Sequence, residues 1–391
     1  MNDIVQGILY DRRCVLSDED YMQAALKLAE KGCGWVNPNP MVGAVIVKDD
    51  YMIGMGYHQR YGELHAERQA ISNCTESPQG AVLYVTLEPC CHFGKTPPCT
   101  EAIIESGIRR VVIGSFDPNP VVAGKGVQIL RQHGIEVTEG VMQEECIQLN
   151  DVFFHFMQRK TPYVVMKYAM TMDGKIAACS GQSKWITGKS ARERVQKDRH
   201  RYSGIMTGAG TILSDNPLLT CRLPDCKSPV RIICDTQLKT PFQSNVVQTA
   251  RQYQTILATC CTDRRKVRAY QEMGCEVLVV SRKDGHVDLK ELMIALGKRR
   301  IDSILLEGGE TLNWSALSGG IVHKVQVYLA PKLFGGTKAK SPIGGIGVWA
   351  PQEAYRLMPP LVTLLGEDIL LESEVITCLP ESLKNPESSG I

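Results

Sequence analysis

One histidine, one glutamate and several cysteines in the first third of the chain have the types and spacing of a catalytic zinc site. His65 and Glu67 are two residues apart, and Cys90 and Cys99 follow later in the chain. Imidazole and thiolate are preferred zinc ligands; a structural site uses four of them, whereas a catalytic site leaves one position for water. The glutamate beside the imidazole matches the H-x-E…P-C pattern of zinc deaminases, in which it carries protons. These residues therefore predict a hydrolytic deaminase.

The spacing of the thiols departs from that pattern. The usual second cysteine follows three residues after the first, whereas this chain has Cys91 directly after Cys90 and then Cys99. Adjacent side chains point to different sides, so we expect His65, Cys90 and Cys99 to hold the ion. The ion would lower the pKa of its water towards about 7, and Glu67 would pass the proton to the departing amine. A closed structural site with His92 as fourth ligand, or a buried histidine beside unrelated thiols, are the alternatives.

The elements that must position these residues alternate between strand and helix. Ser17 caps a helix with acidic residues in its first turn. Helical stretches begin at His65, at Thr100 and near Gly126, and strand-like runs cover residues 41–47, 81–87, 110–115 and 135–138. This alternation predicts a layered α/β domain. Positions i and i+2 do not face each other on a helix, so Glu67 can reach the water only if His65 lies in the opening turn.

A second alternation follows a segment of mixed polarity at residues 142–160. A helix is predicted over residues 191–202, and strands near residues 204–207, 230–234, 255–258, 276–280, 303–306 and 324–329. We therefore expect two domains, at residues 17–160 and 161–377. Residues 1–16 are interpreted as an N-terminal extension. Residues 378–391, rich in proline, serine, glutamate and asparagine, are expected to be disordered.

Two glycine pairs in the second half predict a phosphate-bearing cofactor. The run 304–306 leads as a strand into Gly308 and Gly309 and then into a helical stretch, and such a junction directs free N–H groups at phosphate. Gly208 and Gly210 end another strand and would let the backbone approach a ligand. No G-x-G-x-x-G opens the second domain, which disfavours a Rossmann fold.

Composition excludes several classes of protein. The net charge is +2, from 44 basic and 42 acidic residues, which argues against binding to a long nucleic acid. No run approaches the roughly 18 apolar residues of a membrane span, and the first residues lack the features of a signal peptide. The fifteen cysteines are not spaced as a disulfide framework, so we expect a cytoplasmic protein.

Several stretches of the first half resemble one family of deaminases. They are residues 37–43 (NPNPMVG), 56–58 (GYH) with Gly62, 65–67 (HAE), 86–99 (TLEPCCHFGKTPPC), 117–120 (DPNP) and 123–126 (AGKG). These stretches are similar to the deaminase half of the RibD family, bifunctional enzymes of riboflavin biosynthesis whose thiolate pair has the spacing seen here. The resemblance implies a cytidine-deaminase-like α/β/α layered domain holding one Zn²⁺. It implies substrate contacts at Asn39, His58, His92, Lys95 and Thr96.

Two residues differ from the usual family pattern. Cys91 stands where serine is usual, and Lys95 stands where arginine is usual. Lysine still neutralises a phosphate but lacks the bidentate fork of arginine. Neither change removes a group that the chemistry needs.

The second half resembles the reductase half of the same family. The matching stretches are residues 167–177 (KYAMTMDGKIA), 183–188 (SKWITG), 208–211 (GAGT), 215–222 (DNPLLTCR) and 307–311 (EGGET). The resemblance implies a dihydrofolate-reductase-like α/β domain that uses NADPH. It places cofactor contacts at Ala169, Trp185, Thr211, Asp215 and Gly309, and substrate contacts at Ser183, Arg199, Leu219, Arg222 and Glu307. We take Lys167 and Glu307 as the candidates for handling the proton of the reduction.

The predicted activity is therefore bifunctional. The first domain would hydrolyse the 2-amino group of 2,5-diamino-6-ribosylamino-4(3H)-pyrimidinone 5′-phosphate, and the second would reduce the ribosyl group of the uracil product to ribityl. The partner would be this small phosphorylated pyrimidine, with no nucleic acid or membrane, and the resemblance implies a homo-oligomer. The alternatives are a tRNA- or DNA-editing deaminase with an RNA-binding appendage, a true dihydrofolate reductase in the second half, and a non-catalytic zinc module.

Overall fold

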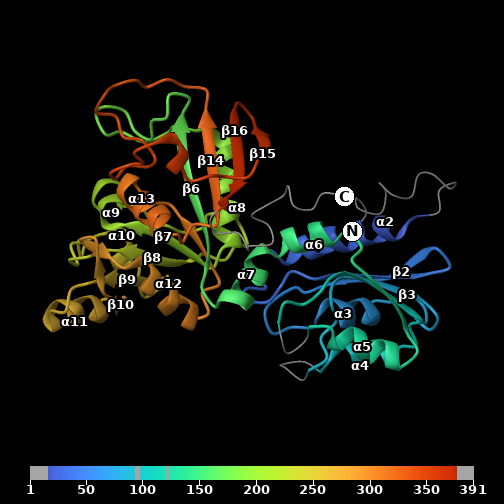
Figure 1. Cartoon of the computed structure of the whole chain (residues 1–391). Helices are drawn as coiled ribbons and strands as arrows, with labels where there is room; N and C mark the ends of the chain where they lie inside the picture. The colour runs from blue at the N-terminus through green and yellow to red at the C-terminus, as the bar shows by residue number, and fades with distance from the viewer. Residues whose placement is uncertain (1–15, 93–96, 120–122, 377–391) are drawn as a thin grey trace. The chain divides into compact units, whose positions relative to one another are not determined.

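The chain folds into two compact units that divide between Gln158 and Arg159 (Figure 1). The computed structural model describes residues 16–92, 97–119 and 123–376. The predicted extension at residues 1–16, apart from Leu16, and the predicted tail at residues 378–391 lie outside the described residues.

The first unit is built on a five-stranded sheet, within the part of the chain that the structure describes. The strand order is β2-β1-β3-β4-β5. Strand β1 is antiparallel to β2 and to β3, whereas β3, β4 and β5 run parallel. The strands are β1 (Gly43–Lys48), β2 (Tyr51–Tyr57), β3 (Val82–Leu87), β4 (Arg110–Ser115) and β5 (Glu136–Glu139).

Helices cover both faces of this sheet and make the unit an α/β/α layer. Figure 1 shows α2 and α6 on one side and α3, α4 and α5 on the other. Two apolar clusters fill the two layers; one includes Met22 and Val45, and the other Ile46 and Ile103. The helices are α2 (Asp18–Ala29), α3 (Ala66–Ser72), α4 (Cys99–Glu105), α5 (Lys125–Gln132), α6 (Gln143–Leu149) and α7 (Asp151–Arg159), with a 3₁₀ turn η1 (Glu30–Gly32).

Two glycines allow the helices to approach the sheet closely. A Cβ on Gly43 of β1 would lie 1.9 Å from the Ala25 carbonyl oxygen of α2, and one on Gly56 of β2 would lie 2.4 Å from the Ala66 carbonyl oxygen of α3. Any larger residue would push these helices away from the sheet. Since α3 begins next to His65, Gly56 also fixes the distance of the predicted zinc ligand from the sheet.

The second unit is built on a nine-stranded sheet, counted over the described residues. Its order is β10-β9-β8-β7-β13-β6-β14-β16-β15, and the strands are parallel from β10 to β14 and antiparallel from β14 to β15. The strands are β6 (Tyr163–Thr171), β7 (Gly204–Gly208), β8 (Val230–Cys234), β9 (Thr255–Thr259), β10 (Glu276–Val279), β13 (Ser303–Leu306), β14 (Lys324–Ala330), β15 (Leu361–Leu365) and β16 (Asp368–Glu374), with a small hairpin of β11 (Arg282–Lys283) and β12 (His286–Val287).

Apolar clusters pack helices on both faces of this sheet too. One cluster joins α12 and α13 to strand residues such as Met166 and Leu306, and the other face packs Ile205 and Tyr328 against further helices. The helices are α8 (Lys189–Arg201), α9 (Ala209–Asp215), α10 (Asn245–Gln248), α11 (Arg264–Glu272), α12 (Leu289–Lys298) and α13 (Glu310–Ser318), with a 3₁₀ turn η2 (Pro351–Glu353).

The predicted fold class, α/β in both halves, is confirmed, but several elements were missed. Strand β2 contains Gly54 and Gly56, which weaken a strand pattern although they are needed for helix packing. The segment taken as a mixed-polarity bridge, residues 142–160, contains helices α6 and α7. Among the described residues, no helix has the length and apolar character to cross a membrane.

Candidate active sites

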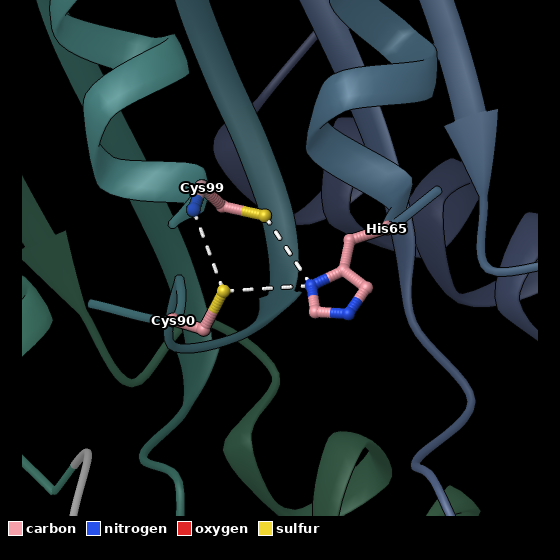
Figure 2. Close-up of side chains that lie close together, drawn as sticks. All are labelled: His65, Cys90 and Cys99. Carbon is pink, nitrogen blue, oxygen red and sulfur yellow. Dashed lines mark hydrogen bonds between the residues drawn. The ribbon is translucent and has the colours of Figure 1, made fainter. Parts of the chain in front are cut away.

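His65, Cys90 and Cys99 meet at one point of the first unit (Figure 2). Nδ1 of His65 lies 3.4 Å from Sγ of Cys90 and 3.4 Å from Sγ of Cys99. The backbone N–H of Cys99 donates to the Cys90 sulfur at 3.4 Å. The structure thus brings together all three residues that we predicted as zinc ligands.

Two of the ligands stand at helix starts, and Cys90 lies in the loop that follows β3. His65 is the N-cap residue of α3, with extended backbone at φ −72° and ψ 161°, and Cys99 is the first residue of α4. His65 therefore meets the condition set by the sequence, because its extended backbone directly precedes the first helical turn, in which Glu67 lies. Arg68 of α3 fixes the start of α4 by donating to the carbonyl oxygens of Pro97 (3.1 Å) and Pro98 (2.7 Å).

The donor set fits Zn²⁺. An ion bonded to nitrogen at about 2.1 Å and to sulfur at about 2.3 Å in tetrahedral geometry holds the two atoms about 3.6 Å apart, close to the 3.4 Å seen for His65 and each cysteine. Nδ1 is the ring atom that faces both sulfurs. Three protein ligands leave the fourth position for water, which is the arrangement of a catalytic site.

The charges of the thiols point the same way. Hydrogen bonding from Cys99, helped by His65, lowers the pKa of Cys90 to about 4. Hydrogen bonding with Cys90, together with burial, raises the pKa of Cys99 well above its usual value. A bound cation would favour the ionised form of both thiols.

Glu67 lies beside this group and is only 3% exposed. Burial, and then the charge of Cys90, raise the pKa of its carboxyl to about 7. The Cys99 thiol also hydrogen-bonds to it. A carboxyl with a pKa near neutral can both accept and donate a proton, which is what a general acid–base group needs.

Asn39 and His58, predicted as substrate contacts, lie side by side. Nδ2 of Asn39 is 3.2 Å from Nε2 of His58, whose Nδ1 is 3.1 Å from the Leu64 carbonyl oxygen. Burial lowers the pKa of His58, so its ring is neutral, with the proton on Nδ1. Nε2 then accepts from Asn39 and leaves Oδ1 of Asn39 as an acceptor for a ligand N–H group.

The other predicted contacts of this unit do not join the group of His65, Cys90 and Cys99 among the described residues. His92 is exposed and does not belong to the ligand group found among the described residues, so the closed four-ligand site is not formed. Cys91 is also outside that group, as the geometry of adjacent residues predicted. Lys95 and Thr96 lie outside the described residues.

Sequence reasoning missed Glu88, a buried carboxylate two residues before Cys90. It is 3% exposed and accepts backbone N–H groups of Asp117 (3.4 Å), Gly124 (3.0 Å), Gly126 (3.0 Å) and Val127 (3.4 Å). Glu88 therefore ties the start of α5 to the strand that leads into Cys90. The available signal was its place in the run of residues 86–90, where it is the one charged residue.

A second group of charged residues gathers in the other unit, where the carboxyl end of β13 lies beside the middle of β6 and the last turn of α8. Arg199 of α8 donates to both oxygens of Glu307, with its Nε 2.8 Å from Oε1 and a terminal nitrogen 3.0 Å from Oε2. Lys167 of β6 lies 3.9 Å from Oε2 of Glu307. Arg199 also donates to the Thr220 carbonyl oxygen at 3.1 Å, which brings in the loop that carries Leu219. In open α/β sheets, ligands bind at this edge.

These charges set one another's protonation. Burial alone would raise the pKa of Glu307, but Arg199 and then Lys167 outweigh it and hold that pKa at about 2. Burial lowers the pKa of Lys167, and Glu307 opposes this effect. The carboxylate is thus a fixed anion, and Lys167 is the group whose proton is more easily given up.

Glycines at the ends of two strands leave room for a cofactor. Gly309 is the N-cap of α13 without a side-chain cap, and a Cβ on Gly309 or on Gly210 of α9 would meet nothing within 4 Å. Neither glycine is required by packing or by positive φ. Open N–H groups at a helix start suit a phosphate, so the donor set of these two strand–helix junctions fits NADPH.

The remaining predicted contacts lie on several elements of this unit. Ala169 lies on β6 and Thr211 on α9. Arg222 adds its positive charge near Glu307, and the indole of Trp185 is 63% exposed and packs against Arg192. Among the described residues, no hydrogen bond or ion pair joins Ser183 or Asp215 to the Arg199–Glu307 group.

Two family matches divide the chain in the same way. Residues 16–115 match the cytidine and deoxycytidylate deaminase zinc-binding region, and residues 162–371 match the RibD C-terminal domain. The first match includes all three proposed ligands and Glu67. The second includes Lys167, Arg199 and Glu307.

Curated and solved proteins match nearly the whole chain. The RibD protein of Actinobacillus pleuropneumoniae is 54% identical over 93% of this chain and 97% of its own length, and that of Escherichia coli K12 is 42% identical over 82% and 89%. The solved RibD of Acinetobacter baumannii has a TM-score of 0.82 at 35% identity, covering 92% of this chain and 98% of that one. A deaminase/reductase from Thermotoga maritima has a TM-score of 0.79 at 39% identity, with the same coverage.

Proposed function

Because this chain belongs to the RibD family, the bifunctional deaminases and reductases of riboflavin biosynthesis, we propose an assignment of its two reactions to the residues of its two units. The chain is both a hydrolase and an oxidoreductase. It deaminates 2,5-diamino-6-ribosylamino-4(3H)-pyrimidinone 5′-phosphate and then reduces the ribosyl group of the product to ribityl. It has the cytidine-deaminase-like and dihydrofolate-reductase-like folds of the family, and it uses Zn²⁺ and NADPH.

The deamination is assigned to the first unit. When bound by His65, Cys90 and Cys99, zinc lowers the pKa of water to about 7. With the ion held there, Glu67 would take one proton of the attacking water and deliver it to the 2-amino group, which leaves as ammonia. The water oxygen would stay on C2 as the new carbonyl oxygen, and the second proton of the water would stay on the neighbouring ring nitrogen. Asn39, oriented by His58, accepts a hydrogen bond from the pyrimidine. Lys95 and Thr96 are assigned to the ribose phosphate.

The reduction is assigned to the second unit. NADPH supplies the hydride to C1′ of the opened sugar. Lys167 provides the proton that balances this transfer, and Glu307 holds Lys167 and Arg199 in place. Arg199 and Arg222 suit the phosphate of the substrate, since guanidinium groups pair with phosphate oxygens in two parallel hydrogen bonds. Ala169, Trp185, Thr211, Asp215 and Gly309 are assigned to the cofactor, and Ser183 and Leu219 to the substrate.

The wider properties of the protein are also proposals. The deaminase and reductase domains are assigned to residues 17–160 and 161–377. The near-neutral charge supports a small-molecule substrate rather than a nucleic acid. The proposed localisation is the cytoplasm, and the family resemblance supports a homo-oligomer.

The observation that carries the deaminase assignment is the convergence of one imidazole nitrogen and two thiol sulfurs beside a buried glutamate. The test is NADPH oxidation by the purified chain given the diaminopyrimidine ribosyl phosphate, before and after zinc removal. Oxidation that requires both substrate and zinc supports two sites acting in sequence. The uracil intermediate, supplied directly, should restore oxidation without zinc, and its failure to do so would contradict the reductase assignment.

A further inference from the structure

The ammonium of Lys167 is largely shielded from water and has no anion within 3.5 Å among the described residues. Its side chain is 14% exposed, and its nearest anion, Glu307, is 3.9 Å away. Both oxygens of Glu307 already accept hydrogen bonds from Arg199. One carboxylate therefore serves two cations, and Glu307 alone does not explain a protonated lysine here.

Tyr328 of β14 forms a second contact with this ammonium. Strand β14 runs parallel to β6 and pairs Gln326 with Lys167 and Tyr328 with Ala169, so these side chains share one face of the sheet. Nζ of Lys167 lies 5.6 Å from the centre of the Tyr328 ring, within the range of a cation–π contact. The ring is fully buried, and such contacts strengthen when they are shielded from water.

Asp198 of α8 holds the Tyr328 ring in place through its hydroxyl group. The Tyr328 hydroxyl donates to Oδ2 of Asp198 at 2.9 Å, and Asp198 is 3% exposed. Asp198 also pairs with Arg194 one turn earlier in α8, at 3.3 Å. Since Arg199 follows Asp198 directly in α8, one turn of this helix holds both Glu307 and Tyr328.

We propose that Tyr328 and Asp198 are positioning residues of the reductase centre: the Tyr328 ring seats the Lys167 ammonium, and the Asp198 carboxylate holds that ring in place and adds a negative charge behind it. The proposal rests on the role of Lys167 stated above. The distribution of charge supports the proposal: Lys167 and Arg199 share the carboxylate of Glu307, and Asp198, which also pairs with Arg194, is a second negative charge on this side of the sheet.

The charged groups that face Lys167 are Glu307, Arg199 and Asp198. Burial lowers the pKa of Lys167, and Arg199 lowers it further, whereas Glu307 and Asp198 raise it. A buried lysine without enough negative charge nearby loses its proton. Asp198 should therefore raise the pKa of Lys167 above the value that Glu307 alone would give. Lys167 would then keep its proton up to a higher pH.

The experiment measures kcat for NADPH oxidation as a function of pH, with the complete chain, Zn²⁺ and the uracil intermediate supplied directly. The wild-type rate should fall at high pH as Lys167 loses its proton. In Asp198→Asn this basic limb should move to lower pH by on the order of one unit, the size expected for one charge in a partly buried site. KM for NADPH should stay within about twofold, because Asp198 does not touch the cofactor.

Glu372→Gln is the matched control. Glu372 belongs to the same polar network, accepting from Gln326 at 2.9 Å and pairing with Arg194 at 3.5 Å, but it is not among the charges that face Lys167. It should change stability much as Asp198→Asn does and leave the basic limb in place. A shift of equal size in both variants would overturn the proposal.

The ring is tested separately. Tyr328→Phe keeps the ring and should retain kcat within about threefold, whereas Tyr328→Leu removes the cation–π contact and should lower kcat by about tenfold or more. Deaminase activity and thermal unfolding of each variant report whether the chain still folds. Equal kcat values for the folded Phe and Leu variants would remove Tyr328 from the proposal.

Lys167→Met separates this proposal from the function on which it rests. A much lower residual rate of reduction that no longer falls at high pH would support Lys167 as the proton donor. A Lys167→Met enzyme with the wild-type rate and profile would refute that assignment itself. If Lys167→Met behaves as expected but Asp198→Asn shows no shift, Asp198 is uncharged or too distant, and only the positioning role fails.

Discussion

Replacing Glu67 by glutamine should separate the two activities of this chain. The amide has nearly the shape of the carboxyl, so the buried site keeps its packing, but it neither accepts nor donates the proton that deamination moves. Glu67 is 3% exposed, so bulk water cannot easily take its place. The three ligand atoms come from His65, Cys90 and Cys99, so the ion should remain.

The expected loss is that of one general acid–base group, about 10²–10⁴-fold in the rate of ammonia release, or about 3–5 kcal/mol in the barrier. Reduction of the supplied uracil intermediate should stay within about twofold of wild type, because Lys167 and Glu307 belong to the other unit. Thus NADPH oxidation should fail with the diamino substrate and proceed with the uracil intermediate.

The assay follows ammonia release and NADPH oxidation on the same preparation, with zinc content measured by metal analysis. Glu19→Gln is the matched control, since Glu19 is an exposed glutamate in the first turn of α2, in the same unit. It should leave both rates unchanged. A Glu67→Gln enzyme that still releases ammonia at the wild-type rate would refute the proton-carrier role. Loss of zinc, or of both activities, would show instead that Glu67 is needed for the fold of the site.

Three further predictions follow from single contacts. Glu307 has a pKa of about 2 in the folded chain against 4.5 for the free group. Its contribution to the free energy of unfolding, about 3 kcal/mol, is therefore present above about pH 4.5 and lost as the pH falls towards about 2. Urea unfolding across this range should show a weaker pH dependence in Glu307→Gln than in the wild type. Gly309→Ala should raise KM for NADPH about tenfold with an unchanged melting temperature, because the added Cβ fills open space at the start of α13; an unchanged KM would contradict the cofactor assignment. Glu88→Gln should lower the free energy of unfolding by about 1–3 kcal/mol, because an amide group cannot accept at both ends; Glu105→Gln, at an exposed position, should not.

The sequence alone determined the chemistry of the first site. Histidine, cysteine and glutamate are rare enough in this spacing that their types predict zinc and a proton carrier before any fold is known. The local rules of helix ends also sufficed to require that His65 stand at the opening turn of its helix, where the structure places it. Such features depend on neighbours in the chain and are therefore visible in the sequence.

Other parts of the site depend on residues that no local pattern connects. Arg199 and Glu307 are 108 residues apart and meet only because α8 packs on the same sheet whose strand β13 leads into Glu307. Glu88 has an unremarkable sequence position, yet it receives four N–H groups from a segment that starts 29 residues later. No periodicity encodes these pairings, since they arise from strand order and helix packing.

The contrast is clearest at Lys167. From the sequence, it was taken as a candidate for handling the proton of the reduction. Whether its ammonium keeps a proton depends on Glu307, Tyr328 and Asp198, which come from three other elements. The sequence by itself determined which groups could do the chemistry, because that is a property of residue type. Only the tertiary structure decided their burial and their charged neighbours, because both depend on which distant segments the sheet brings together.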